Sequence, residues 1–544
     1  MQKRRFLLLS VLTGILLSGG WYSGFTGLVL LIAFIPLLYV EEYFLENKER
    51  FTSFQAVKYA FLSFLIWNIL TSWWIKNASV FGVVAAVLIN TTLMSLVFWL
   101  SHISGRKLGR GFGYFALLVF WISFEHFYIN GEISWPWLTL GYGFANDIIF
   151  VQWYEYTGSL GGTLWVLLAN VVLFRAVKAR ISPLHSYKKG TMVAALLVVF
   201  VPIIISLVRF YTYENKGTPH EIVVVQPNID PYKKFVALSS EEQTGIMVRL
   251  ADSLATANTS YIVAPETAIN NNIWLEKMKE NQDIQMIKNF IDTKYPAAKF
   301  IVGITSYLAY ADEGSASHTA RPLGSSGQFY DSFNTSIQID TTEVVQYYHK
   351  SKLVVGVEKM PYPQYLKFLR KLTLQLGGAF RSHGTQENRI SFISPQDSTG
   401  IGTAICYESI FGEFVTEYIK SGTNLLFIIT NDGWWGDTPG YRQHNAFAAL
   451  RAIETRKSIA RSANTGISSF FDQRGEMLQK LGWWQRGAIK ETLYANEVIT
   501  FYTRHGDYIA RVSYFFALVV LVYLLVRVLM ERHPHARTTR QTYK

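Results

Sequence analysis

Residues 402–408 read GTAICYE, a short run of small and apolar residues that ends in the chain's single cysteine. Such a run favours a buried β-strand, which we expect over residues 402–406. One cysteine cannot form an intramolecular disulfide, and it leaves no Cys-rich metal site. Cys406 is therefore either a small buried residue or a nucleophile.

Further strand candidates lie on both sides of this run, at 222–226, 261–265, 300–305, 333–340, 344–349 and 425–430. Between them, helical stretches are expected over 239–257, 274–293 and 441–460. The alternation predicts an α/β domain whose sheet faces are covered by helices. Residues 312–327, rich in Gly, Ser and charge, are expected to form a surface loop.

The sequence that flanks this domain is far more apolar. Charged residues make up 17% of the chain, against about 25% in a typical soluble protein. Runs of about 20 apolar residues can cross a bilayer; such runs lie at 6–23, 25–41, 57–75, 79–101, 113–130, 160–178, 191–210 and 513–530. We therefore expect about eight transmembrane helices: seven in a membrane domain over residues 1–210, and one in a final segment over 512–544 with a tail. The α/β domain occupies 211–511.

Lys and Arg are distributed unevenly among the loops. They lie before the first span, between spans two and three, four and five, and six and seven, and after the last span. Residues 131–159, by contrast, contain none. By the positive-inside rule, both termini are expected in the cytoplasm and the α/β domain on the opposite side. The basic N-terminus could pass for a signal peptide, but the six spans that follow favour a retained helix. The net charge of +12 is not gathered in one basic run, which argues against nucleic-acid binding.

Three reactive side chains each follow a predicted strand. Glu266 follows YIVAP, Lys350 follows VVQYYH and Cys406 follows GTAI. In open α/β sheets, ligands bind at the carboxyl ends of strands. A carboxylate can take the thiol proton so that the thiolate attacks a carbonyl, and a cation can stabilise the oxyanion that forms. Taken singly, each residue also has a structural reading: a buried cysteine, a solvated lysine or a helix-capping glutamate.

The motifs around these residues are APET (264–267), YHKSKL (348–353) and ICYE (405–408). In this order they resemble the carbon–nitrogen hydrolase, or nitrilase, superfamily, whose triad is Glu, Lys and Cys. The resemblance is to one membrane-bound branch in particular, the apolipoprotein N-acyltransferases, and it covers essentially the whole chain. It extends to VQPNI (225–229), NDGWWGD (431–437), RSANTG (461–466), YTRHGD (502–507) and WPWL (135–138).

The resemblance implies an αββα sandwich for the α/β domain. It assigns Glu266 as general base, Cys406 as nucleophile and Lys350 as the cation that stabilises the tetrahedral intermediates. We prefer Lys350 to Lys352 because it holds the Tyr-x-Lys-x-x-Leu position. Supporting or substrate-binding roles fall to Glu358, Tyr407, Glu408, Phe235 and Trp434. A cysteine beside a base and a cation is expected to have a depressed pKa.

The chain departs from the family at two of these places. Residues 353–358 read LVVGVE where the family has LVPFGE, and Phe235 stands where the family has a tryptophan. Both changes keep an apolar or aromatic character. They concern the lid over the site and the acyl-chain preference, and leave the triad intact.

The resemblance implies a ping-pong acyl transfer in the bacterial inner membrane, with the α/β domain in the periplasm. Cys406 takes an acyl chain from a phospholipid as a thioester, and the α-amino group of a diacylglyceryl-cysteine on an apolipoprotein accepts it. The implied partners are these two substrates and membrane lipid; no metal or organic cofactor is implied. Two alternatives stay open: a membrane-tethered amidase or nitrilase that hydrolyses a C–N bond, and a non-catalytic membrane scaffold or transporter. Seven spans before the domain argue against the first, and the intact triad against the second.

Overall fold

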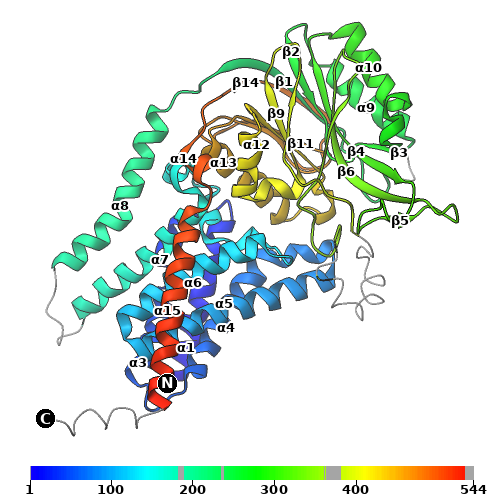
Figure 1. Ribbon diagram of the computed structural model, residues 1–544. Coiled ribbons are helices and arrows are strands. Elements are labelled where there is room, and N and C mark those ends of the chain that lie inside the picture. Colours follow the sequence, from blue (N-terminus) through cyan, green and yellow to red (C-terminus); the bar gives the residue numbers. More distant parts are fainter. Residues whose placement is uncertain (1, 182–188, 235–237, 360–361, 363–381, 533–544) are drawn as a thin grey trace, which may run out of the picture.

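The computed structural model describes residues 2–181, 189–234, 238–359, 362 and 382–532. It has a helical half and an α/β half (Figure 1). The chain enters the α/β half after α8 and returns to the helical half at α15. The helical half contains α1 (Gln2–Ser18), α2 (Leu30–Ala33), α3 (Ile35–Glu46), α4 (Ser53–Ser72), α5 (Val80–Leu108), α6 (Arg110–Asn130), α7 (Tyr154–Ile181), α8 (Lys189–Thr212) and α15 (Tyr508–Arg532).

Among the described residues, seven helical segments are long and apolar enough to cross a membrane. They are Gly27–Glu46, Ser53–Asn77, Val80–Leu108, Arg110–Asn130, Tyr154–Arg180, Lys189–Thr212 and Tyr508–Glu531. The first predicted span forms α1, which is shorter at 17 residues. A 3-10 turn over Gly19–Trp21 ends it, because glycine is a poor helix former. Seven of the eight expected spans are therefore long enough to cross a membrane. The shorter α1 packs against α4.

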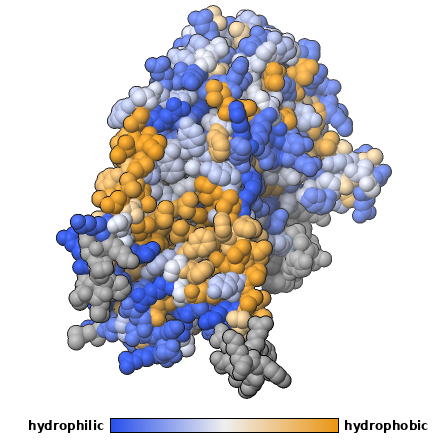
Figure 2. All heavy atoms as spheres, turned by 60° about the vertical axis from the view of Figure 1, so that its left-hand side comes forward, coloured by the Kyte–Doolittle hydropathy of each residue, from blue (hydrophilic) through white to orange (hydrophobic). Residues whose placement is uncertain are grey.

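The surface of the helical half carries the apolar residues that a bilayer would cover. Figure 2 shows a hydrophobic band across this half, with more hydrophilic surface above and below it. The span in α8 has the highest mean hydropathy of the seven, 2.8, yet only 11% of it is buried within the protein. An apolar helix with so little protein contact is stable only where lipid covers it.

Two β-sheets form the α/β half. The first has the order β14-β1-β2-β4-β6-β5, with β3 beside β4 and β7 beside β6. The second has the order β13-β12-β11-β10-β9-β8. The strands of the first sheet are β1 (Thr218–Gln226), β2 (Thr259–Val263), β3 (Ile269–Trp274), β4 (Lys299–Tyr310), β5 (Arg321–Pro322), β6 (Phe329–Ile339), β7 (Gln346–His349) and β14 (Gly487–Ala495). Those of the second are β8 (Ser391–Ile393), β9 (Gly400–Ile405), β10 (Leu425–Thr430), β11 (Ile459–Ala463), β12 (Ser468–Phe471) and β13 (Met477–Leu481).

The alternation of side chains along β1 shows how the layers pack. Val223 and Val225 belong to the core beneath α9 (Ser240–Asp252) and α10 (Gln282–Lys294). Ile222 and Val224 belong to the core that the second sheet shares. A strand buried on both faces reads as a continuous apolar run, as IVVV does here. On the far side, α12 (Gly412–Lys420) and α13 (Pro439–Thr455) cover the second sheet, which completes the predicted αββα sandwich.

The strands expected from apolar runs all appear, but the helix expected over 274–293 is wrong at its start. Trp274 ends β3, and α10 begins only at Gln282. Asn281 caps this helix by accepting from the backbone N–H groups of Asp283 and Ile284, at 3.0 and 3.3 Å. Strands β3, β5, β8 and β11–β14 were not expected, and the short β5 lies within the predicted surface loop. β3 has three consecutive asparagines at its centre, which β-strands disfavour.

Candidate active site

The three residues that resemble a triad come from three strand ends. Glu266 lies beyond β2, Lys350 follows β7 and Cys406 follows β9. All three are buried, with exposed fractions of 6%, 1% and 9%. The two packed sheets bring these strand ends to one place, so the structure unites the residues that the sequence separates by 140 positions.

Lys350 is the centre of a buried charge cluster. Its Nζ lies 3.0 Å from Glu266 Oε1 and 2.9 Å from Glu358 Oε1. The Asn334 amide on β6 donates to the same two oxygens, at 2.7 and 3.2 Å. Burial lowers the pKa of Lys350, but the Glu266 and Glu358 carboxylates outweigh it and raise that pKa well above its usual range. The lysine is therefore a permanent cation.

Backbone N–H groups fix the two carboxylates. The N–H of Asn431 donates to Glu266 Oε2 at 3.1 Å, and that of Val354 donates to Glu358 Oε2 at 2.8 Å. Burial raises the pKa of Glu358, whereas Lys350 and the Val354 bond lower it, and the net shift is downward. The altered LVVGVE segment thus still delivers Glu358 to Lys350.

Lys352, the competitor for the lysine role, lies elsewhere. Its Nζ lies over the rings of Phe411 and Phe414, at 5.1 and 5.8 Å from their centroids. Burial, and then the nearby Lys359, lower its pKa. It makes no ion pair with Glu266 or Glu358 among the described residues.

Cys406 sits in a strained turn immediately after β9. Its φ is +52°, in the left-handed region that favours glycine. The expectation of a depressed pKa is wrong: burial, and then the Glu266 carboxylate, raise the pKa of the thiol despite the opposing effect of Lys350. The low-dielectric surroundings penalise the thiolate more than one already paired lysine favours it. A neutral thiol requires a base to become a nucleophile.

Glu408 and Tyr407 hold the turn in place. Glu408 is fully buried and accepts from the hydroxyls of Tyr348 and Tyr418, at 2.8 and 2.9 Å, and from the Ile405 N–H at 2.8 Å. Tyr407 donates to the backbone carbonyl of Ser134, at 2.8 Å, in the loop that precedes WPWL. The first bonds fix the turn within the domain, and the second ties it to the helical half.

An aromatic cluster lies between the reactive residues and the membrane helices. The ring of Trp435 lies 4.9 Å from that of Trp74 and 5.7 Å from that of Trp137. Trp434 is 39% exposed and contacts Tyr232 edge to face. Phe235 lies outside the described residues.

Four polar residues of this site were given no role from the sequence. Asn334 joins the two carboxylates, and Asp432, His444 and Arg461 form a fully buried network behind Cys406. Asp432 and Arg461 stand within motifs already recognised, NDGWWGD and RSANTG. No spacing signal marks Asn334 or His444, because their partners come from distant strands.

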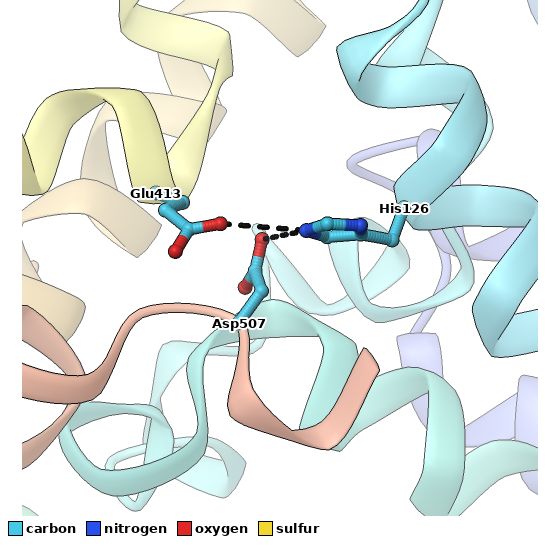
Figure 3. Close-up of side chains that lie close together, drawn as sticks. All are labelled: His126, Glu413 and Asp507. Carbon is cyan, nitrogen blue, oxygen red and sulfur yellow. Dashed lines mark hydrogen bonds and ion pairs between the residues drawn. The ribbon is translucent and has the colours of Figure 1, made fainter. Parts of the chain in front are cut away.

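One group among the described residues has the composition and spacing of a metal site. His126 of α6, Glu413 of α12 and Asp507 before α15 point toward one another (Figure 3). His126 Nε2 lies 3.4 Å from Glu413 Oε2 and 3.9 Å from Asp507 Oδ2. Arg511 pairs with Glu413, and the Tyr502 hydroxyl donates to Asp507 at 2.8 Å. Because the Arg511 guanidinium already pairs with Glu413, the charge of that carboxylate is balanced without a metal. We call these three residues, His126, Glu413 and Asp507, the junction cluster, since they join the two halves of the protein.

Family models match both the helical half and the α/β half of the chain. Residues 221–501 match the carbon–nitrogen hydrolase family, and residues 13–172 match the apolipoprotein N-acyltransferase N-terminal domain. The chain is 28% identical to an apolipoprotein N-acyltransferase of Chlorobaculum tepidum over 91% of each chain. It is 28% identical to one of Geobacter metallireducens over 93% of each, and 24% identical to one of Thermotoga maritima over 94% of this chain and 92% of the relative.

Solved structures resemble the α/β half. Nit3 of Saccharomyces cerevisiae, a member of branch 10 of the nitrilase superfamily, matches with 13% identity and a TM-score of 0.35, over 52% of this chain and 93% of its own. A carbon–nitrogen hydrolase superfamily protein of Xanthomonas campestris matches with 14% identity and a TM-score of 0.34, over 51% and 90%. The two family matches and the full-length relatives give one conclusion: this multi-pass membrane protein belongs to the carbon–nitrogen hydrolase family, in the branch of the apolipoprotein N-acyltransferases.

Proposed function

We propose that the protein transfers an acyl chain from a membrane phospholipid to the α-amino group of a diacylglyceryl-cysteine on apolipoproteins, through a thioester on Cys406. The observation that carries this proposal is the convergence of Glu266, Lys350 and Cys406 in one buried site beside the membrane helices. A thiol, a base and a fixed cation are the groups that acyl transfer needs.

In the first half-reaction, Glu266 takes the proton of the Cys406 thiol, and the sulfur attacks an ester carbonyl of the phospholipid. The carbonyl oxygen becomes an oxyanion. Lys350 has three N–H groups, of which two point to Glu266 and Glu358. The third is available for the oxyanion. When the C–O bond breaks, the leaving alkoxide receives the proton from Glu266, which leaves a lysophospholipid and a thioester.

In the second half-reaction, the α-amino group of the acceptor attacks the thioester. Glu266 removes a proton from the amine, an amide bond forms and the C–S bond breaks. The proton then returns to the Cys406 sulfur. Because burial raises the pKa of the Cys406 thiol, the thiol needs the base for its activation in the first half-reaction.

The position of the site suits substrates that are anchored in a membrane. The Tyr407 bond to Ser134 and the Trp74–Trp435 contact set the turn and its aromatic cluster directly against the ends of the helices. The site therefore lies next to the helices that lipid would surround. The loop charges favour cytoplasmic termini and a periplasmic α/β domain in the inner membrane. The proposed partners are the phospholipid donor, the diacylated apolipoprotein and surrounding lipid.

A transfer assay tests this proposal. The full chain in detergent is given a phospholipid donor, and mass spectrometry follows the acyl gain of a diacylated lipopeptide. Without acceptor, the protein itself should gain one acyl chain. Cys406→Ala should lose both signals, by about 10⁴-fold or more, with the free energy of unfolding changed by less than about 1 kcal/mol. Release of free fatty acid or ammonia, with an unchanged peptide, would instead establish the hydrolase alternative.

A further inference from the structure

Three polar side chains, a carboxylate, an imidazole and a guanidinium, lie buried behind Cys406, and no step of the proposed reaction uses them. Asp432 follows β10, His444 lies on α13 and Arg461 lies on β11. Each side chain is 0% exposed. Burying charge is costly unless the charge is paired and hydrogen-bonded, so this network invites an explanation beyond packing.

On one side, the network fixes the ring of His444. Its Nδ1 lies 2.9 Å from Asp432 Oδ1, and Arg461 Nη2 donates to Asp432 Oδ2 at 2.7 Å. Burial raises the pKa of Asp432, but Arg461 and His444 outweigh it, so that pKa lies well below its usual range. The ring is also flanked by Trp137 and Trp435, whose centroids lie 5.9 and 5.6 Å away. The imidazole is thus held in one orientation.

On the other side, the same ring reaches the backbone of the nucleophile. His444 Nε2 lies 3.3 Å from the Cys406 carbonyl oxygen and 3.2 Å from Ser409 Oγ. The Ser409 hydroxyl donates to that carbonyl at 2.7 Å. Cys406 has a φ of +52°, a conformation that needs support in a residue other than glycine. The contacts therefore converge on a residue whose backbone conformation needs support.

We propose that His444 is a positioning residue for acyl transfer. With a proton on Nε2, and with Arg461 Nη2 3.1 Å from Nδ1, the ring donates to the Cys406 carbonyl and maintains the left-handed turn that presents the thiol to Glu266 and Lys350. Asp432 and Arg461 act through it by fixing the ring. This inference rests on the proposed function for its kinetic test. Because His444 contacts the backbone of Cys406, it acts on the geometry of attack and leaves substrate binding unchanged.

Two amide substitutions separate this role from simple stabilisation of Asp432. In His444→Gln, the amide nitrogen can occupy the position of Nε2 and donate to Cys406; in His444→Asn, it can replace only Nδ1 and face Asp432. A misplacement of about 1 Å can cost about 100-fold in rate. We therefore expect His444→Asn to lose about 100-fold in kcat for acyl-enzyme formation with KM within twofold. His444→Gln should recover about tenfold or more of that loss.

The matched control is Asn445→Ala, on the same helix. Asn445 is 5% exposed and accepts from the Ser469 hydroxyl at 2.7 Å, away from Cys406. Its loss should leave kcat within about threefold, with melting temperature measured for all variants. The inference is overturned if His444→Asn retains more activity than His444→Gln, or if Asn445→Ala loses as much kcat as His444→Asn.

A second readout does not depend on acyl transfer. Cys406 is the single cysteine of the chain, so its alkylation by iodoacetamide is followed by intact mass without background. A thiol displaced from Glu266 should be alkylated more slowly in His444→Asn, and His444→Gln should restore the rate. If the native chain transfers no acyl group but His444→Asn is still alkylated more slowly than His444→Gln, the proposed function fails and the positioning role stands. If transfer occurs and His444→Asn is alkylated faster than His444→Gln, the positioning role alone fails.

Discussion

Two charge clusters among the described residues look alike in composition but differ in burial and construction. The reaction centre joins Lys350 to Glu266 and Glu358, and it lies among strand ends within the α/β half. The junction cluster of His126, Glu413 and Asp507 joins a membrane helix, a helix of the α/β half and the segment before α15 (Figure 3). Of the two clusters, only the first adjoins the strained turn of Cys406, the proposed nucleophile.

The difference teaches how buried charge is used in the two places. At the proposed reaction centre, one cation donates to two carboxylates, and its third N–H group is the one proposed to bind the oxyanion. At the junction, Arg511 neutralises Glu413, whereas Asp507 is left with Tyr502 and the more distant His126. We infer that the first cluster is arranged for chemistry and the second for holding two halves together.

Removing the cation of the reaction centre should have the largest effect. Lys350→Ala leaves Glu266 and Glu358 buried without their partner, which costs about 3–5 kcal/mol of folding free energy. Loss of oxyanion stabilisation should also lower acyl transfer by about 10²–10³-fold. Denaturant unfolding and the transfer assay measure the two separately. Activity within tenfold of the native chain would remove Lys350 from the reaction.

Removing a side chain of the junction cluster should lower the free energy of unfolding and leave the rate of acyl transfer nearly unchanged. His126→Ala removes a ring whose Nδ1 lies 3.0 Å from the Tyr514 hydroxyl and whose Nε2 lies 3.4 Å from Glu413. We expect a loss of about 1–3 kcal/mol and a kcat within about threefold at a temperature where the fold is intact. Phe127→Ala, an exposed neighbour on α6, is the matched control. A large loss of kcat without loss of stability would erase the distinction between the clusters.

The junction should also respond to pH. Burial, and then the Glu413 charge, raise the pKa of Asp507 to about 7, while hydrogen bonds and Arg511 hold that of Glu413 at about 2. Because the folded pKa of Asp507 exceeds the unfolded value, its contribution is present below about pH 4 and is lost as pH rises through 7. The melting temperature of the native chain minus that of Asp507→Asn should therefore fall between about pH 4 and 7 and level off at higher pH. A difference that rises with pH would contradict this sign.

The smallest effect is expected at Lys352, two residues from Lys350. Its contact with Phe411 and Phe414 is worth about 0.5–1 kcal/mol. Lys352→Ala should lower stability by about that amount, measured by denaturant unfolding. Acyl transfer should stay within about threefold of the native rate. A loss as large as that of Lys350→Ala would exchange the roles of the two lysines.

The sequence predicted most of the sandwich because its buried strands are continuous apolar runs, such as IVVV in β1 and LLFIIT in β10. It did not predict β3, whose central asparagines are exposed or half-buried and leave only Ile269 and Ile273 as a signal. Short sequence motifs identified Glu266, Lys350 and Cys406 as candidates. They could not predict that Asn334 bridges the two carboxylates or that His444 contacts Cys406, because such contacts depend on how two sheets pack.

The raised pKa of the thiol could not be read from neighbours in the sequence. A nearby cation predicts a lower value, but the effect of burial depends on the depth of the site, which only the fold sets. The end of the first span was likewise placed too late, at residue 23 instead of Ser18, because apolar composition continues through the glycines that follow the helix.

The first strand of the α/β half pairs with its last. β1 runs antiparallel to β14, with Thr218 opposite Ala495 and Gln226 opposite Gly487. While the chain is being synthesised, β1 must therefore wait for more than 260 further residues before that edge is closed. An open edge is prone to wrong pairing, and contacts so distant in sequence form slowly. Truncations that remove β14 should yield aggregates rather than a partly active domain, and the emerging chain is most in need of chaperones during that interval.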